Sequence, residues 1–158
     1  MSESKPSNPK QALGSDKFPF HLWPETATLL GTLGMLEGML KYGRSNFRAS
    51  GVKASIYYDA CKRHLTAWFE GQDKAPDSEI HHLGHALACL AILVDAMAAS
   101  KLEDDRMYEG GYQRMLDEVT PEVKRLKEKY ADMHPHHFTM NDNGTGLDVD
   151  PKLTGNTK

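Results

Sequence analysis

Three stretches of the chain repeat apolar residues at intervals of three and four positions, the interval that places side chains on one face of an α-helix. The first stretch follows Pro24, a residue suited to the first turn of a helix. Its apolar positions are Leu29, Leu30, Leu33, Leu36, Met39 and Leu40. The pattern predicts a helix over about residues 24–41 that ends at Gly43.

The second stretch, VKASIYYDACKRHLTAWFEG, predicts a helix that packs through one face and carries charge on a neighbouring stripe. The packing face holds Tyr57, Cys61, His64, Leu65 and Trp68, and the stripe holds Asp59, Arg63, Thr66 and Glu70. The third stretch, EIHHLGHALACLAILVDAMAAS, is so apolar that other elements should surround it, and Pro76 precedes an N-cap at Asp77 or Ser78. We expect this third helix to be the core helix.

Polar segments border the three helices. Residues 1–16 predict a flexible leader, and residues 134–158 predict a disordered tail. Residues 101–133 begin as a polar connector with a glycine pair, and Thr-Pro-Glu at 120–122 predicts the start of a peripheral helix. No segment predicts a strand. We therefore expect an all-α fold, a compact helical bundle of three main helices with a peripheral C-terminal helix and disordered ends.

Composition narrows the class of protein. The 158 residues carry a formal net charge of -3 and a pI near 6.2, without the clustered basic face of a nucleic-acid-binding domain. No apolar run approaches the roughly 18 residues that cross a bilayer, and the N-terminus lacks a signal peptide, so we expect a cytoplasmic protein without a membrane partner. Cys61 and Cys89 lie in helical patterns and predict free thiols. The apolar third helix also predicts a homo-oligomer.

Histidines and a carboxylate lie at helical intervals where the third helix begins. Glu79, His82 and His85 occupy positions i, i+3 and i+6. One interpretation is that the histidines are core residues hydrogen-bonded to backbone or to Asp73. The other is a metal or nucleotide site, because imidazole and carboxylate at this spacing can share a cation or orient a water.

The charged stripe of the second helix also allows two interpretations. Asp59 and Arg63 are spaced for a solvent-exposed ion pair worth a few tenths of a kcal/mol. Alternatively, Arg63 and His64 beside Glu70 form a wall for a polyphosphate and its Mg²⁺, because guanidinium binds phosphate oxygens in pairs.

The segment KYGRSNF follows the first helix. A glycine cap at Gly43, with Lys41 near the helix C-terminus, accounts for the first part of it. It does not account for Tyr42, Asn46 and Phe47, an aromatic pair and an amide that can stack on a nucleobase and hydrogen-bond to it.

From residue 17 to about residue 95 the chain resembles the phage and bacterial family of dATP/dGTP diphosphohydrolase N-terminal domains, which are related to MazG-like all-α nucleotide pyrophosphohydrolases. The resemblance is carried, in order, by KFPFHLWP, KYGRSNF, YYDACKRHLTAW and GQDKAPDSEIHHLGHA, with the later DDRMYEGGY. It implies a nucleotide hydrolase-like helical domain over residues 17–100. The implied activity is hydrolysis of purine deoxynucleoside triphosphates to monophosphate and pyrophosphate, with Mg²⁺ (or Mn²⁺) as cofactor.

The positions that match the family are Lys41, Tyr42, Asn46, Arg63, His64, Asp73, Asp77, Ser78, His82 and His85. From the side-chain chemistry we expect three groups of roles. Catalytic residues would be Asp77, His82 and His85. Substrate contacts would come from Lys41, Tyr42, Asn46, Phe47, Arg63 and His64. Metal ligands would be Asp73, Asp77, His82 and Glu79, the last of them inferred from helical spacing alone.

The chain departs from the family pattern at two acidic positions. Gln72 stands where the family often has glutamate, and Ala75 stands at another acidic position. The EExxE and ExxD metal signature of MazG relatives is also absent as such. A non-catalytic nucleotide-binding or helical interaction protein on the same scaffold is therefore the alternative hypothesis.

Overall fold

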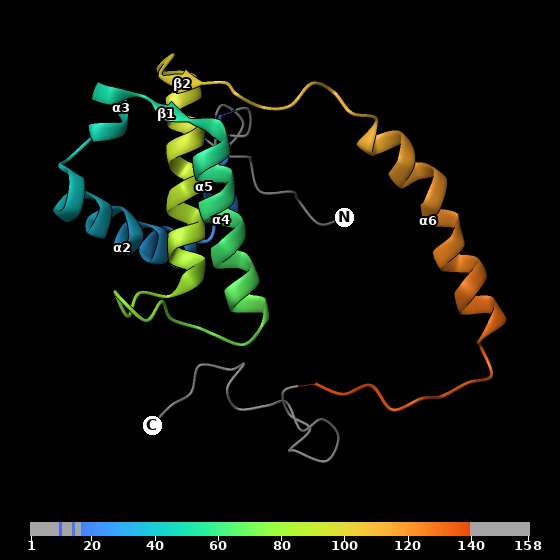
Figure 1. The fold of residues 1–158 in the computed structure, drawn as a ribbon. Helices are drawn as coiled ribbons and strands as arrows, with labels where there is room; N and C mark the ends of the chain where they lie inside the picture. Colours follow the sequence, from blue (N-terminus) through green and yellow to red (C-terminus); the bar gives the residue numbers. More distant parts are fainter. Residues whose placement is uncertain (1–9, 11–13, 15–16, 140–158) are drawn as a thin grey trace, which may run out of the picture. The chain divides into compact units, whose positions relative to one another are not determined.

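The structure is a computed structural model that describes residues 10, 14 and 17–139. It divides into two units, with the boundary between Arg106 and Met107. The first unit contains η1 (Phe20–Leu22), α2 (Glu25–Tyr42), α3 (Asn46–Ser50), β1 (Val52–Lys53), α4 (Ala54–Phe69), α5 (His82–Ala98) and β2 (Leu102–Glu103), and the second contains α6 (Tyr112–Lys129) (Figure 1). Most of the predicted leader and residues 140–158 of the predicted tail lie outside the described residues.

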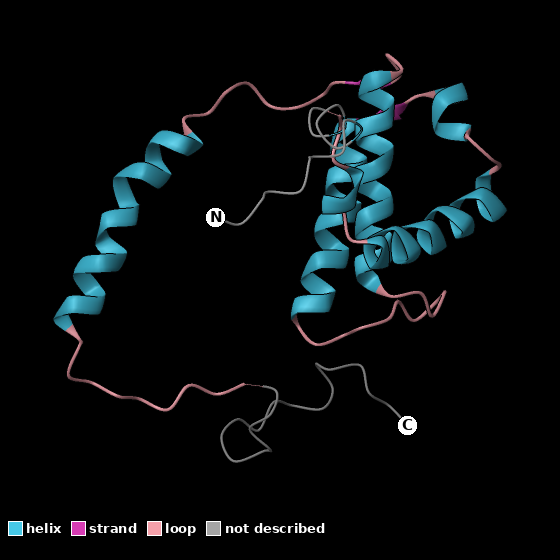
Figure 2. Ribbon diagram, turned by 180° about the vertical axis from the view of Figure 1, so that it is seen from behind, coloured by secondary structure: helices cyan, strands magenta, loops and turns pink. Residues whose placement is uncertain are grey.

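Helix α5 is the centre of the first unit. It contacts both α2 and α4. Helix α4 runs beside α5, and α2 crosses α5 at a steep angle (Figures 1 and 2). The all-α fold and the central position of the third predicted helix are thus confirmed. None of the helices in the described ranges combines the length and the apolar character needed to span a bilayer.

The first predicted helix is confirmed nearly to the residue. Helix α2 ends at Tyr42, where Gly43 takes a φ of 90° and its N–H donates to Met39 O over 2.9 Å. A positive φ of this kind suits glycine, which has no Cβ to clash with the following backbone. The short helix α3 follows at once, because Ser45 turns the chain with a left-handed φ of 59°.

Small residues bring α2 and α5 into close contact. A Cβ placed on Gly34 would lie 2.8 Å from Gly84 O, and a Cβ on Gly84 would lie 2.6 Å from Leu30 O. The other buried positions on α5 are also mostly small, namely Ala86, Ala88 and Ala96. The crossing of these two helices therefore depends on backbone contact, and larger apolar side chains such as Leu29 and Leu40 stay exposed on α2.

A two-residue parallel strand pair fixes the ends of α4 and α5, although the sequence predicted no strand. Val52 pairs with Leu102, and Lys53 pairs with Glu103. Just after the second strand, the Asp105 carboxylate accepts from Ser55 N over 2.8 Å and so caps the first turn of α4. Strands of two residues are too short to show an alternating pattern of apolar and polar residues, so the sequence carries no periodic signal for them.

Residues 73–82 form a tight hairpin ahead of α5, which we call the 73–82 hairpin. Ala75 N donates to Ile80 O over 3.0 Å, and His82 N donates to Asp73 O over 2.8 Å. Lys74 and His81 pair as an antiparallel bridge. The Ile80 carbonyl, which would accept from Gly84 N in a helix that began at Glu79, is therefore already used, and Gly84 N donates to His81 O instead.

The predicted start of the third helix is wrong for this reason. Helix α5 begins at His82 rather than at Glu79, and its cap is His81, whose Nδ1 accepts from Leu83 N over 3.1 Å, not Asp77 or Ser78. Glu79 lies in the hairpin with a left-handed φ of 57°. The helical spacing between Glu79 and His82, on which the role of Glu79 was based, does not exist.

The predicted start of the last helix is also wrong. Helix α6 begins at Tyr112, eight residues before the Thr-Pro-Glu sequence, and contains Pro121 in its interior. Proline has no N–H to donate to the carbonyl four residues earlier, so it usually ends a helix. Here Thr120 Oγ1 donates to Leu116 O over 2.7 Å, and the helix continues through the proline to Lys129.

Candidate functional site

Three imidazoles from two helices converge in the first unit, and we call them the histidine cluster. His64 comes from α4, and His82 and His85 come from adjacent turns of α5. The Nδ1 atoms of His64 and His82 are 2.8 Å apart. The rings of His64 and His85 stack with centroids 4.5 Å apart and planes inclined by 18°. The side-by-side packing of α4 and α5 thus brings together residues that are far apart in sequence.

Hydrogen bonds at the edge of the cluster favour one assignment of the ring protons. His82 Nε2 lies 3.2 Å from Gln72 Oε1, a carbonyl oxygen that can only accept, so His82 donates from Nε2. In the neutral ring, His82 Nδ1 is then an acceptor for the Nδ1–H of His64. His64 is left with an unprotonated Nε2, the nitrogen that can take a proton.

His85 has its own pair of contacts. Its Nε2 lies 3.0 Å from Ser78 Oγ, and its Nδ1 lies 3.5 Å from Glu37 Oε2. The carboxylate favours a proton on Nδ1, which makes Nε2 the acceptor for the Ser78 hydroxyl. Ser78 in turn accepts from Ile80 N over 3.3 Å, so the 73–82 hairpin is tied to the cluster.

Burial and like charge favour the neutral forms of His64 and His82 by lowering the pKa of each imidazole. Desolvation lowers the pKa of His64, and His85, His82 and Arg63 lower it further, while Asp77 opposes them. Burial also lowers the pKa of His82, which is only 5% exposed. Because the ordinary histidine pKa is about 6.5, His64 and His82 are neutral at pH 7.

Two cations lie in the region of the cluster. Lys41 forms an ion pair with Glu37 on the same face of α2, and its Nζ also lies 3.8 Å from Asp77 Oδ2 in the hairpin. Arg63 precedes His64 on α4 and is close enough to lower the pKa of that imidazole. Lys41, Arg63, Asp77 and the histidines therefore belong to one region.

Glu37 belongs to this region too, and the sequence analysis missed it. It contacts both Lys41 and His85, so it links α2 to α5. The available signal was its position four residues before Lys41, which places the two side chains on one helix face. That signal alone could not indicate that the face turns toward the histidines.

Of the four residues predicted as metal ligands, His82 belongs to the histidine cluster and Asp77 lies close enough to affect its pKa, but the four do not form one ligand set. Asp77 is near Lys41, Asp73 Oδ1 is 4.0 Å from His81 Nε2, and Glu79 is exposed in the hairpin. Over residues 17–139, no group of three or more His, Cys, Asp or Glu side chains is arranged to hold a metal ion. The donors present in this arrangement therefore do not fit a preformed Mg²⁺ site.

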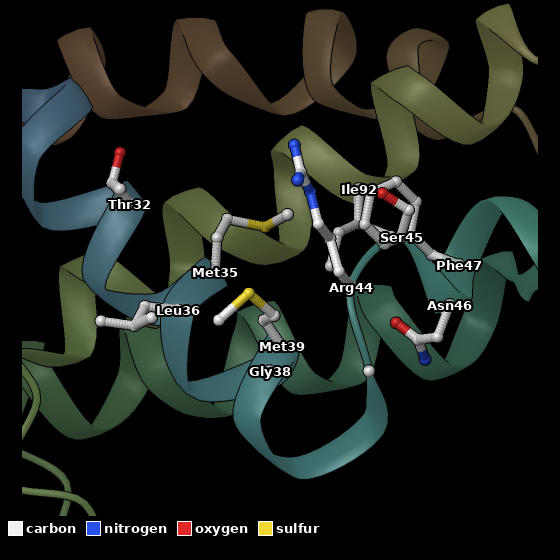
Figure 3. Close-up of a pocket in the computed structure, with 12 residues that line it drawn as sticks. Thr32, Met35, Leu36, Gly38, Met39, Arg44, Ser45, Asn46, Phe47 and Ile92 are labelled. Carbon is white, nitrogen blue, oxygen red and sulfur yellow. The ribbon is translucent and has the colours of Figure 1, made fainter.

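Asn46 and Phe47 line a different feature, a pocket of about 320 Å³ between α2, α3 and α5 (Figure 3). Met35 and Met39 form its wall on α2, and Arg44 extends over them. Because Met35 and Met39 are each two positions from Glu37, the pocket lies on the opposite face of α2 from the histidine cluster. The structure therefore separates these two predicted base contacts from the predicted phosphate contacts. Tyr42 is 70% exposed.

A family model described as dATP/dGTP diphosphohydrolase, N-terminal, matches residues 7–106. The chain belongs to this family. The match contains the histidine cluster, Glu37, Lys41 and the whole 73–82 hairpin, and it ends at the boundary between the two units. The diphosphohydrolase family segment is thus the first unit, and α6 lies outside it.

A curated relative agrees with the diphosphohydrolase family assignment. It is named dATP/dGTP diphosphohydrolase, comes from Salmonella phage PMBT28, and is 26% identical over 114 residues. The aligned part covers 72% of this chain but 33% of the relative, so the chain spans about a third of that protein's length. No solved structure matches the chain.

Proposed function

We propose that this chain hydrolyses purine deoxynucleoside triphosphates to the monophosphate and pyrophosphate. The family assignment supports the reaction class, and the phage relative's name supports the substrate. The observation that carries the proposal is the 2.8 Å contact between the Nδ1 atoms of His64 and His82, which leaves His64 Nε2 for a reactant's proton, beside the cations Lys41 and Arg63. Attack of water on a phosphoanhydride needs a proton acceptor and positive charge near the phosphates.

Each side chain has a definite task in this proposal. His64 Nε2 takes a proton from the attacking water, and His82 accepts a hydrogen bond from His64 Nδ1, which stabilises the imidazolium that forms. Gln72 holds His82 in the required tautomer. Arg63 and Lys41 neutralise the charge that builds on the phosphate oxygens.

Mg²⁺ or Mn²⁺ is the cofactor that the family resemblance implies, and it would neutralise phosphate charge when bound. The dispersed Asp73, Asp77 and Glu79 do not form a ligand set for it, so the proposed steps are those of the side chains alone. Metal dependence is tested directly, by comparing turnover with Mg²⁺, with Mn²⁺ and with a chelator.

The experiment is a pyrophosphate-release assay with each of the four deoxynucleoside triphosphates. We expect turnover of dATP and dGTP. Replacing His64 with asparagine keeps a donor near the position of Nδ1 but removes Nε2, so kcat should fall by about 100-fold or more while KM changes little. His21, an exposed histidine in η1, provides the matched control, and His21→Asn should leave both constants unchanged. Equal turnover by His64→Asn and the unaltered chain would refute the role of His64.

A non-catalytic nucleotide-binding protein is the second candidate. The observation in its favour is Gln72, which contacts the cluster at a position where the family often has glutamate. In that case calorimetry would detect nucleotide binding while the assay detects no pyrophosphate from any substrate. Restoring the carboxylate with Gln72→Glu would then separate a lost activity from a wrong reaction class.

A further inference from the structure

Helix α6 carries an apolar stripe with the spacing of a coiled coil. Its residues alternate intervals of four and three positions, and we call them the α6 stripe: Tyr112, Leu116, Val119, Val123, Leu126, Tyr130 and Met133. In heptad terms Leu116, Val123 and Tyr130 occupy position a, and the others occupy position d. The repeat runs the full length of the helix and continues just beyond its end at Lys129.

Nothing within residues 107–139 covers this stripe. Its seven side chains are between 40% and 77% exposed, and α6 has no buried residue. Pro121 lies at heptad position f, on the opposite side of the helix. The carbonyl that proline leaves without an intrahelical donor is that of Asp117, at position b, so it also faces away from the stripe.

We propose that the α6 stripe is the interface of a parallel two-stranded coiled coil with a second copy of this chain. The charged residues beside the stripe favour a second copy of the chain as the binding partner. Glu122 is at position g and Lys127 is at the following position e, and g-to-e pairs lie across a parallel interface. Each Glu122 then faces Lys127 of the second copy, and the symmetry of the dimer makes this contact twice.

The same charges disfavour the antiparallel arrangement. An antiparallel pair that overlaps the full stripe places g positions opposite g positions, which brings Glu122 of each copy together. In the structure Glu122 Oε2 accepts from Arg125 Nε over 2.6 Å within the helix. Arg125 is at position c and points away from the interface. The Glu122 carboxylate has further lone pairs that can accept from Lys127 of the second copy. The inference does not depend on the proposed function, because α6 lies outside the family segment.

Sedimentation of the full chain over a range of concentrations tests the apolar part of the interface. Val123→Asp places a charge at the centre of the stripe and should weaken self-association by about tenfold or more. Val123→Ala favours the helix yet removes packing, so it should also weaken association. Lys124→Gln, at the outward position b, makes the same change in net charge as Val123→Asp and should have no effect.

Charge reversal tests the partner and the orientation. Glu122→Lys and Lys127→Glu should each weaken self-association by about threefold to tenfold, because two attractive contacts become repulsive. A mixture of these two variants should associate at least as well as the unaltered chain, since every g-to-e pair across a mixed dimer is then attractive. Arg125→Gln removes the same intrahelical bond without touching the interface and should leave association unchanged.

Two results would overturn the inference. The first is equal association of the unaltered chain, Val123→Asp and Val123→Ala, which would mean that the stripe is not the interface; association through the first unit would be common to all variants and would cancel in the comparison. The second is a mixture of Glu122→Lys and Lys127→Glu that associates no better than either alone, which would exclude the parallel pairing. A monomeric chain whose stripe is covered by its own first unit would give the first result.

Discussion

At the scale of single residues, burial and most of the neighbouring charges oppose protonation of His64. Desolvation is the largest cause, His85 and His82 on α5 and Arg63 on α4 add to it, and Asp77 in the hairpin favours the positive charge. The imidazole is therefore suited to remain neutral until it accepts a proton from a reactant.

This arrangement predicts how stability changes with pH. The folded-state pKa of His64 lies below its unfolded value of about 6.5, so the unfolded chain binds the proton more readily. Stability should be fully present above pH 6.5 and decrease as the pH falls below that value, toward the folded-state pKa. Denaturant unfolding at several pH values measures this, and His64→Asn should reduce the dependence. An identical dependence in that variant would assign it to other groups.

Gly84 is the residue where the helix crossing has the least room. Replacing it with alanine puts a methyl group 2.6 Å from the Leu30 carbonyl, so the free energy of unfolding should fall by about 2 kcal/mol. Gly38→Ala is the matched control, because its new methyl has no neighbour within 4 Å, and it should raise stability by about 0.5–1 kcal/mol. Equal effects of the two variants would contradict the close crossing.

The identity and spacing of the histidines predicted part of the candidate site. The sequence indicated His82 and His85 by their spacing and His64 by its position on the second helix, and the structure brings all three together. The separation of Asn46 and Phe47 from these residues could not be predicted, because it depends on which face of α2 packs against α5. That choice is made by Gly34 and Gly84, and an absent side chain gives little sequence signal.

At the scale of elements, the 73–82 hairpin decides where α5 begins. Its backbone bonds keep residues 79–81 out of the helix and leave Glu79 with a left-handed φ of 57°. A side chain with a Cβ costs about 1–2 kcal/mol in this conformation, and glycine avoids that cost. The backbone of the 73–82 hairpin is therefore strained at Glu79.

Glu79→Gly should accordingly raise the free energy of unfolding by about 0.5–1 kcal/mol, after the extra backbone entropy of glycine is subtracted. Glu70 provides the control, since its φ of -80° suits any residue and Glu70→Gly should lower stability. Thermal unfolding of both variants makes the comparison. We also expect Glu79→Gly to retain activity, because Glu79 is exposed and not gathered with other acidic ligands. A loss of activity in this variant would support the predicted role of Glu79 as a metal ligand.

The boundaries of elements were predicted less well than their existence. The bounds of α2 followed from apolar spacing and a glycine cap, two local signals that agree. For α5 and α6 the local signals, Pro76 and Pro121, indicated helix starts that the structure does not have. Before α5, the backbone hydrogen bonds of the 73–82 hairpin delay the start of the helix. In α6, the helix continues through Pro121, which lies on the side opposite the α6 stripe.

At the scale of the whole molecule, the two proposals concern different units of the chain. Every residue of the histidine cluster, its hydrogen-bond partners and the Asp105 cap of α4 lie at or before Arg106. A chain that ends at Arg106 should therefore keep the helices of the first unit and the proposed pyrophosphate release, while losing the proposed association through α6. Circular dichroism, the release assay and sedimentation measure these three properties. Loss of more helical signal than the 18 residues of α6 account for would show that the first unit needs the second.

The glycine and alanine contact between α2 and α5 has a thermodynamic consequence. Glycine and alanine lose almost no side-chain entropy on burial, and they also remove little apolar surface from water. Exposure of apolar surface is what raises the heat capacity on unfolding, at about 12–15 cal/mol/K per residue in ordinary domains. The first unit should fall below that range, which would make its stability vary gently with temperature.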